Sequence, residues 1–159
     1  MLLRGVNNIL FLVLILAFIG CNRKSDPPYE FKDQNLQGKI ITQQWSFVDG
    51  VARLSPTSND TLLIGLYNIH LDQDCSYAVS EEGVNFFVPN HQGIFQLASE
   101  WESPQSVTLY SGIDNEHAWR GAIEITQIDT VNNRIYGNLD ATVDDESSVN
   151  GKFSVSLCK

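Results

Sequence analysis

The stretch Ile135-Tyr136-Gly137-Asn138-Leu139-Asp140-Ala141-Thr142-Val143 decides the fold class of this chain. Every second residue, beginning with Ile135, is apolar or glycine, and the residues between them are mostly polar. A repeat of two residues is that of a β-strand, because successive side chains point to opposite faces of a sheet. One apolar and one polar face are typical of an antiparallel sheet with a solvated side. The stretch therefore predicts such a sheet in the last third of the chain.

Neighbouring segments extend this prediction on both sides. Residues 153–158 alternate in the same way, and residues 123–125 form a short run in which apolar residues flank a polar one. Residues 129–133 are a turn-rich connection of hairpin length. Asn150-Gly151 predicts the turn into the last strand, because both residues tolerate a positive φ. We therefore expect a meander of three strands, with residues 107–110 as a further strand upstream.

Short apolar segments separated by turn-forming residues continue back to the start of the domain. They are residues 40–48, 51–54, 61–67, 76–79, 84–88 and 94–97. Short strands at this spacing predict an all-β fold, a single antiparallel β-sandwich or flattened barrel of about 8–10 strands, of which a calycin-like barrel is one form. No long segment after Cys21 has a helical period. We expect helical turns only at residues 115–119.

The first twenty residues have the pattern of a secretory signal peptide. A segment with Arg4 precedes an apolar run over residues 9–19, and the small residue Gly20 follows. A membrane-spanning helix is the alternative, but the run is much shorter than the roughly 20 apolar residues that cross a bilayer. We interpret residues 1–20 as an N-terminal signal segment that is removed on export.

Phe18-Ile19-Gly20-Cys21 resembles a bacterial lipobox, in which a small residue precedes a cysteine that is acylated and becomes the mature N-terminus. Phe18 stands where leucine is usual, and ordinary cleavage that leaves Cys21 unmodified is the alternative. The resemblance implies several acyl chains on Cys21. Each buried CH₂ contributes about 0.8 kcal/mol, so several chains would give a stable membrane anchor. Asn22 replaces the aspartate that favours inner-membrane retention, which implies the outer membrane.

Residues 22–36 are mostly polar, contain Pro27-Pro28 and carry both signs of charge. Such a segment buries too little apolar surface to offset the entropy lost on ordering. We therefore divide the chain into the signal peptide over residues 1–20, an acylated cysteine with a flexible tether over residues 21–37, and a β-domain over residues 38–159.

The charge of the chain narrows the choice of partners. Removal of residues 1–20 takes away Arg4, and the formal net charge changes from −9 to −10, with 19 acidic residues against 9 basic ones. An acidic surface repels nucleic acid and anionic lipid headgroups. We therefore expect attachment to a membrane through lipid and no binding of nucleic acid.

Four segments of the domain resemble small lipoproteins of unassigned function from bacteria of the Bacteroidota type. In those proteins a lipobox and a short tether precede a compact β-domain, which opens with a Gly-to-Trp strand and closes with an Asn-Gly-x-Phe strand. The resemblance covers about 20 of 159 residues and implies an all-β fold in the bacterial cell envelope, without catalytic residues. The matching segments are Gly38-Lys39-Ile40, Trp45-Ser46-Phe47-Val48-Asp49-Gly50, Gly121-Ala122-Ile123-Glu124-Ile125-Thr126 and Asn150-Gly151-Lys152-Phe153.

Two cysteines remain if Cys21 carries lipid. Cys75 and Cys158 form the even pair expected in an oxidising compartment, and they lie 83 positions apart. A bridge over that distance would stabilise the fold by about 4–5 kcal/mol on the loop-entropy account. We expect this disulfide. Two free buried thiols are the alternative.

His70, Asp72 and Asp74 are the weak candidates for a metal site. In an extended segment these alternate residues point to one side. Carboxylates suit Ca²⁺ and imidazole suits a transition metal. The set mixes these preferences and lacks the glycine and distal glutamate of an EF-hand loop. We therefore favour a solvated loop with no bound metal, and we read Asp144-Asp145-Glu146 as an exposed acidic turn.

No catalytic or cofactor motif stands out. His91 and His117 lie in predicted loops, and neither has a recognisable nucleophile beside it. The chain has no Gly-x-Ser-x-Gly elbow, no His-Glu-x-x-His and no glycine loop for a phosphate. Scattered triads escape such a search. The sequence still favours a protein that is not an enzyme and has no cofactor.

Trp101 and Trp119 are the ligand-binding candidates. Both lie in predicted loops, and Trp101 has acidic neighbours on each side. A ring can stack on a sugar or a peptide while polar neighbours orient the ligand. The alternative, favoured for Trp119, is that the ring covers an open end of the β-core. Trp45, inside a predicted strand, is expected in the core.

Two functions follow as hypotheses. The first is a membrane-anchored envelope lipoprotein with a non-catalytic binding or structural role, its partner a protein or a glycan. The second is a lipocalin-like carrier whose barrel holds a small apolar or glycan ligand. An interior filled with apolar side chains would argue against the carrier, and an open apolar pocket of roughly several hundred cubic ångströms would favour it.

Overall fold

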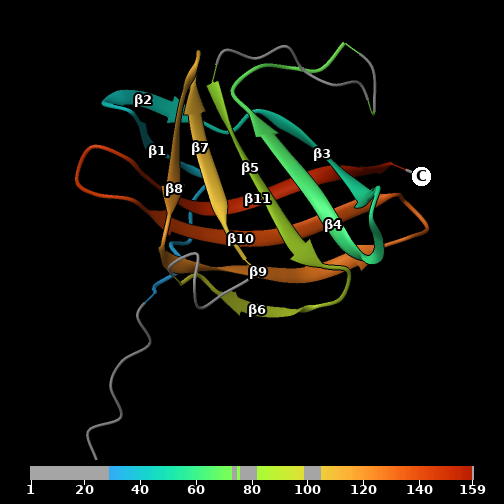
Figure 1. Ribbon diagram of the computed structural model, residues 1–159. Helices are drawn as coiled ribbons and strands as arrows, with labels where there is room; N and C mark the ends of the chain where they lie inside the picture. The colour runs from blue at the N-terminus through green and yellow to red at the C-terminus, as the bar shows by residue number, and fades with distance from the viewer. Residues whose placement is uncertain (1–28, 73–74, 76–81, 99–104, 159) are drawn as a thin grey trace, which may run out of the picture.

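The computed structural model describes residues 29–72, 75, 82–98 and 105–158, and this part of the chain is all-β, with eleven strands and no helix (Figure 1). The all-β prediction is confirmed. The predicted strand at residues 76–79 lies outside the described residues. The strands are β1 (Gln37–Ile40), β2 (Gln43–Ser46), β3 (Asp49–Ser55), β4 (Ser58–Tyr67), β5 (Glu82–Pro89), β6 (Gly93–Gln96), β7 (Val107–Ser111), β8 (Asp114–Ala118), β9 (Arg120–Asp129), β10 (Arg134–Thr142) and β11 (Ser148–Cys158).

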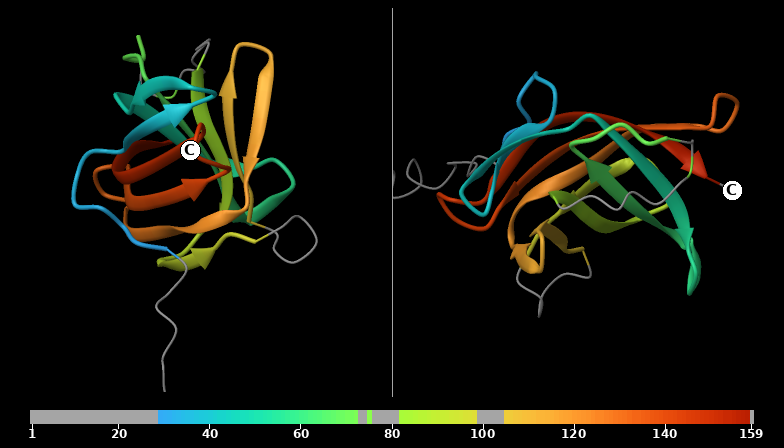
Figure 2. Two further views of the ribbon diagram at one scale, coloured as in Figure 1. Left: turned by 90° about the vertical axis from the view of Figure 1, so that its left-hand side faces the viewer. Right: turned by 90° about the horizontal axis from the view of Figure 1, so that it is seen from above.

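All eleven strands belong to one sheet, in the order β6-β9-β10-β11-β3-β4-β5-β7-β8, with the β1–β2 hairpin attached to β11. The sheet curls into a half-barrel, so that β9, β10 and β11 cross behind β4, β5 and β7 (Figures 1 and 2). A sandwich of two separate sheets is therefore not formed. The strand count exceeds the predicted 8–10, partly because residues 40–48 divide into β1 and β2 at Ile41 and Thr42, which have φ values of 48° and 71°.

The predicted three-stranded meander is confirmed as β9, β10 and β11. Leu139 of β10 faces Ile123 of β9 and Gly151 of β11, and both pairings are antiparallel. A second pairing of β11 was not predicted: its end, residues 156–158, runs parallel to residues 51–53 of β3. The sheet is therefore not purely antiparallel. Nothing in the local pattern of a strand records which distant strand will lie beside it.

The predicted turn at Asn150-Gly151 is wrong, because both residues lie inside β11. The turn falls instead at residues 144–147, where Oδ1 of Asp144 accepts hydrogen bonds from the amides of Glu146 and Ser147 at 2.8 and 2.9 Å. Gly151 has a different role. Its φ is 142°, and a Cβ there would lie 2.8 Å from the carbonyl carbon of Asn35. The glycine lets another backbone segment approach β11 closely.

That segment shows that the predicted tether extends too far. Residues 29–36, here called the N-terminal strap, lie against β10 and β11, and the domain begins before residue 38. The amide of Lys152 donates to the carbonyl of Gln34 at 2.8 Å, and the amide of Leu36 donates to the carbonyl of Lys152 at 2.9 Å. Leu36 is fully buried. One apolar side chain and specific backbone pairing thus order a segment whose composition is polar.

The predicted helical turns at residues 115–119 are also wrong. Residues 114–118 form β8, which pairs with β7 along its whole length. Ala118 lies opposite Val107, and both side chains are buried. Pairing with a neighbouring strand overrides the weak local preference of a short segment.

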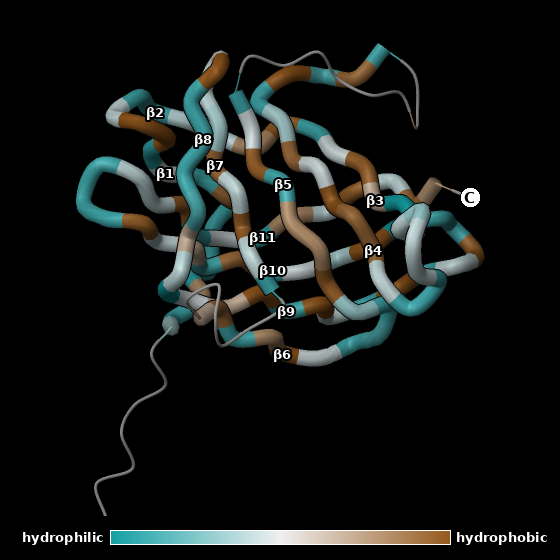
Figure 3. Tube along the Cα trace, in the orientation of Figure 1, coloured by the Kyte–Doolittle hydropathy of each residue, from teal (hydrophilic) through white to brown (hydrophobic). Residues whose placement is uncertain are grey.

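The interior of the half-barrel is filled by apolar side chains. They recur along the strands that enclose it (Figure 3). Trp45 belongs to this core, as predicted, with 2% of its surface exposed. The large side chains that are most deeply buried are Trp45, Phe86, Leu36, Ile40, Leu62, Ile64, Leu66, Leu109, Ile123, Ile125, Ile135 and Leu139.

Candidate functional site

Cys75 and Cys158 form a disulfide with an S–S distance of 2.03 Å, as predicted. The bridge fixes the end of β11 to the segment that follows β4, and it packs against Val51, Tyr67 and Leu71. The carbonyl of Cys75 also accepts a hydrogen bond from Arg53. Both cysteines therefore have a structural role.

Three predicted site residues, Cys21, Asp74 and Trp101, lie outside the described residues. His70 and Asp72 are described and are exposed. Within the described ranges, no group of three His, Cys, Asp or Glu side chains could hold a metal ion. The predicted set of His70, Asp72 and Asp74 is thus not tested as a whole.

The two histidines considered as bases have neutral partners. His117 lies on β8 and not in a loop, and its Nδ1 is 3.2 Å from Oγ1 of Thr108. Nδ1 of His91 is 2.9 Å from the carbonyl oxygen of Gln92, to which it can donate, and its ring lies edge-on to Phe95. The His91 contact is with a carbonyl oxygen, which is not a nucleophile, whereas the His117 contact places a ring nitrogen beside a threonine hydroxyl.

Trp119 lies at the corner between β8 and β9 and is 49% exposed. The guanidinium carbon of Arg120 lies 4.6 Å from the centroid of its ring, in a cation–π contact. The same guanidinium donates to the carbonyl of Val143 at 3.1 Å. One side of the Trp119 ring is thus occupied by a neighbour that is itself held in place.

A concave surface lies on the outer face of β9, β10 and β11, opposite the core. It is an open groove of about 740 Å³, here called the outer-face groove, and Asn35, Phe47 and Val48 form one side of it. Gly137 and Phe153 also line it. Sequence reasoning did not find it, because its side chains are the ordinary polar residues of a solvated strand face.

The alternation that predicted the sheet also builds this groove. Tyr136 and Asn138 of β10 point away from the core, and Ser154 and Lys152 of β11 are their cross-strand partners. Because Ser154 is small, the ring of Tyr136 stays 37% exposed. The pairing of β9 with β10 shifts by one residue between Tyr136 and Gly137, and such bulges re-aim neighbouring side chains.

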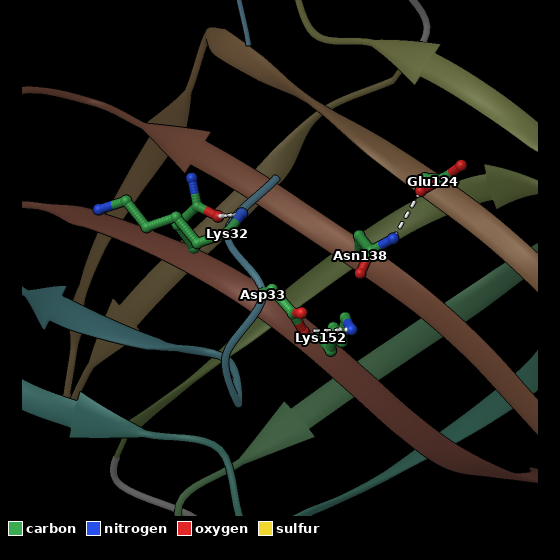
Figure 4. Close-up of polar contacts among 6 residues, drawn as sticks. Lys32, Asp33, Glu124, Asn138 and Lys152 are labelled. Carbon is green, nitrogen blue, oxygen red and sulfur yellow. Dashed lines mark hydrogen bonds and ion pairs between the residues drawn. The ribbon is translucent and has the colours of Figure 1, made fainter. Parts of the chain in front are cut away.

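Hydrogen bonds hold the polar side chains of the outer-face groove in place. Nδ2 of Asn138 lies 2.5 Å from Oε2 of Glu124, and Nζ of Lys152 lies 2.5 Å from Oδ1 of Asp33 (Figure 4). Nδ2 of Asn35 donates to the carbonyl of Phe47 at 3.0 Å. Side chains fixed in this way can present the same donors and acceptors to every ligand molecule.

Arg134 is the most firmly held cation of the groove. Its guanidinium donates to Oγ of Ser154 at 2.8 Å, to the carbonyl of Ser154 at 3.2 Å and to Oγ of Ser156 at 3.5 Å. All of these acceptors are neutral. Lys152 differs, because its ammonium group pairs with Asp33, and the hydrogen bond and charge of Lys152 hold the pKa of that carboxyl below its usual value.

A second, more polar groove of about 500 Å³ lies on the other side of the N-terminal strap. Lys32 and Gln34 of the strap border it, with Asp140 of β10 and Asn150 of β11. Burial raises the pKa of Asp140, although hydrogen bonds from the Glu30 amide and from Asn150 act in the opposite direction. The strap therefore separates two grooves that share one pair of strands.

Along the parts of the chain that the structure describes, no helix is long and apolar enough to cross a membrane. Comparison of the chain with known protein families, curated proteins and solved structures finds no match. A function is therefore inferred from the residues of the outer-face groove.

Proposed function

We propose that the chain is a bacterial envelope lipoprotein, anchored through acylated Cys21, whose β-domain is a non-catalytic binding module. The outer-face groove is the recognition surface of this module. One observation carries the proposal: a groove of about 740 Å³ is lined by polar side chains that hydrogen bonds hold in place. Concave surfaces with a few fixed polar groups are typical of ligand sites.

The same groove lacks the features of a catalytic centre. The described histidines are not among its lining residues, and the hydroxyl of Ser154 accepts a hydrogen bond from Arg134. Removing a proton from that hydroxyl would need a base within hydrogen-bond reach. Binding is therefore the function that this surface supports.

The filled interior argues against the second hypothesis, a lipocalin-like carrier. A carrier needs an apolar cavity inside the barrel. The space enclosed by this half-barrel is occupied instead by fully buried side chains, among them Phe86, Leu139 and Ile123. We therefore place the ligand on the outer face, and a calycin-like interior site is not part of the proposal.

The anchor would keep this surface near the membrane. Tyr29, at the start of the strap, is eight residues from Cys21, a distance that an extended chain spans over at most about 28 Å. The strap borders the outer-face groove through Asn35. A ligand belonging to the cell envelope would therefore be within reach of the module.

Acylation is tested by growing cells that make the protein with labelled palmitate. The chain with Cys21 is expected to carry the label, and Cys21→Ser is expected to lose it. A label that persists in Cys21→Ser would overturn the anchor.

Binding is tested with the soluble Cys21→Ser chain, sedimented with cell envelopes isolated from the bacterium that makes it. Ser154→Trp is designed to fill the groove beside Tyr136, and Ser111→Trp places the same side chain on β7, away from the groove. We expect the parent chain and Ser111→Trp to sediment with the envelopes and Ser154→Trp to stay in solution. Equal behaviour of the three proteins would contradict a binding role for the groove.

A further inference from the structure

We infer that the ligand of the outer-face groove is an uncharged oligosaccharide, and that one of its sugar rings stacks on the ring of Tyr136. This inference rests on the proposed binding function and names the chemical class of the ligand. Three features of the groove carry it. Its charged side chains already have partners, its exposed aromatic ring lies among neutral hydrogen-bonding groups, and its central strand is paired on both sides.

The charges in and beside the groove favour an uncharged ligand. The guanidinium of Arg134 donates to serine oxygens of β11, and Arg134 lies opposite Asp129 of β9. The ammonium group of Lys152 pairs with Asp33. An anionic ligand would have to displace these contacts. The described residues that line the groove include no carboxylate, so a cationic ligand has no direct partner there either.

Tyr136 presents an exposed aromatic ring within the groove. The residue is 37% exposed, and its cross-strand neighbours are Gln127 of β9 and the small Ser154 of β11. The C–H groups on one face of a pyranose stack on such a ring, while polar neighbours bind the hydroxyl groups. Val48, which is 40% exposed, adds a second apolar side chain to the groove. The groove thus combines an apolar platform with hydrogen-bonding groups on two sides of it.

The polar groups near this ring are held by one atom and carry another for a ligand. Nδ2 of Asn138 lies 2.5 Å from Oε2 of Glu124, and Oδ1 of Asn138 is a further acceptor. Oγ of Ser154 accepts a hydrogen bond from Arg134 at 2.8 Å and has its own proton to donate. The amide of Gln127 both donates and accepts. Sugar hydroxyl groups also do both, so they match this set.

The backbone of β10 disfavours a peptide as the ligand. This strand, which carries Tyr136, has β9 on one side and β11 on the other along residues 134–142. A peptide that joins a sheet as an added strand needs an open strand edge, and a peptide helix needs an apolar groove. Amide and hydroxyl groups line this groove instead. An uncharged sugar chain is therefore the class of ligand that the surface fits.

The inference is tested on the sedimentation of the soluble Cys21→Ser chain with isolated envelopes. Protease treatment of the envelopes is expected to leave sedimentation intact. Polysaccharide extracted from the same envelopes is separated on an anion exchanger, and we expect the uncharged fraction to compete for the chain and the charged fraction not to compete. Raising NaCl to about 0.5 M is expected not to weaken binding, because salt screens only contacts between charges.

Three variants locate the stacking ring. Tyr136→Ala is expected to lower the apparent affinity for protease-treated envelopes about tenfold, because the platform is lost. Tyr136→Phe keeps the ring and is expected to bind like the parent. Trp119→Ala removes an exposed aromatic side chain outside the groove and is the matched control, expected to bind like the parent. Thermal unfolding of each variant confirms that it is folded.

The outcomes separate this inference from the proposed function. Sedimentation that is lost on protease treatment, or competition by the charged fraction alone or by neither fraction, would overturn the ligand class. The binding module would remain in place if Ser154→Trp still stayed in solution. Equal affinity of Tyr136→Ala and the parent would overturn the stacking role of Tyr136. Failure of the parent to sediment with untreated envelopes would remove the proposed function itself, and this inference with it.

Discussion

The backbone amide of Glu30 donates a hydrogen bond to Oδ2 of Asp140 at 3.0 Å and so joins residues that are 110 positions apart. Asn150 completes the contact: its Nδ2 donates to the carbonyl of Glu30 at 2.8 Å, and its Oδ1 accepts from the amide of Lys32 at 2.9 Å. The N-terminal strap is thus bound to the outer face of β10 and β11 by side chains that each strand presents.

The pKa of Asp140 makes the stability of the domain with its bound strap depend on pH. Burial raises this pKa above its usual value, outweighing the hydrogen bonds from Glu30 and Asn150 and the charge of Lys32. A raised pKa in the folded state means that the stability gained from the neutral carboxyl is full at low pH and is lost as pH rises through that pKa. Asp140→Asn keeps an acceptor oxygen without the charge.

We therefore expect Asp140→Asn to be more stable than the parent at pH 7 and equal to it near pH 3. Urea unfolding at a series of pH values measures the difference. A stability difference that does not change with pH would show that the charge of Asp140 does not matter.

Gly151→Ala should detach the strap. The added Cβ would lie 2.8 Å from backbone atoms of Gln34 and Asn35, and the φ of 142° is itself unfavourable for alanine. We expect a loss of about 1–3 kcal/mol and faster hydrogen exchange at the amides of Leu36 and Lys152.

Gly112→Ala is the matched control, since Gly112 has a φ of 61° and open space where a Cβ would lie. It should cost about 1–2 kcal/mol without changing exchange at Leu36. Unchanged exchange in both variants would mean that Gly151 does not hold the strap.

Loss of the disulfide should destabilise the whole domain. In a Cys21→Ser background, replacing both Cys75 and Cys158 with serine is expected to lower the free energy of unfolding by about 2–5 kcal/mol. Dithiothreitol should bring the parent to the same level and leave the double variant unchanged. If the double variant unfolds at the same urea concentration as the parent, the bridge does not contribute to stability.

The hydroxyl of Tyr110 should lose its proton only at a higher pH than an ordinary tyrosine. Burial, and in second place the neighbouring hydroxyl of Tyr67, raise the pKa of Tyr110 to about 12. Since the folded pKa exceeds the usual value of 10.0, the domain should lose stability as pH rises from about 10 to about 12. In Tyr67→Phe the pKa of Tyr110 should fall and remain above 10, because burial persists. Absorbance titration at alkaline pH measures both values, and an unchanged pKa in Tyr67→Phe would contradict the coupling.

The regular part of this fold could be predicted because the alternation of apolar and polar residues along a strand shows which side chains are buried. Ile135, Leu139 and Ala141 point into the core, so the pattern of residues 135–143 identifies β10 and its exposed face. The disulfide could be predicted by counting cysteines. In each case the signal lies in the local sequence or in composition.

The remainder depended on contacts between distant segments. Glycine is a residue typical of turns, but Gly151 lies inside a strand. Its missing side chain lets the backbone of Asn35, which lies 116 positions earlier, approach closely. The polar residues around Leu36 in the sequence indicate a tether, whereas in the fold Leu36 is buried and pairs with β11. The outer-face groove escaped prediction for the same reason, because Arg134, Tyr136 and Ser154 become a site only when β10 and β11 are in register.

The position of β11 determines when the sheet can be completed during synthesis of the chain. This strand lies beside β10, β1 and the parallel end of β3, so β1 and β3 pair with a strand that is made much later in synthesis than they are. Pairings between distant segments form slowly, because a long loop must close before they stabilise anything. Until residues 148–158 have left the ribosome, β1 and β3 have no strand to share. A chain exported as we propose could therefore not complete this sheet until residues 148–158 had been made.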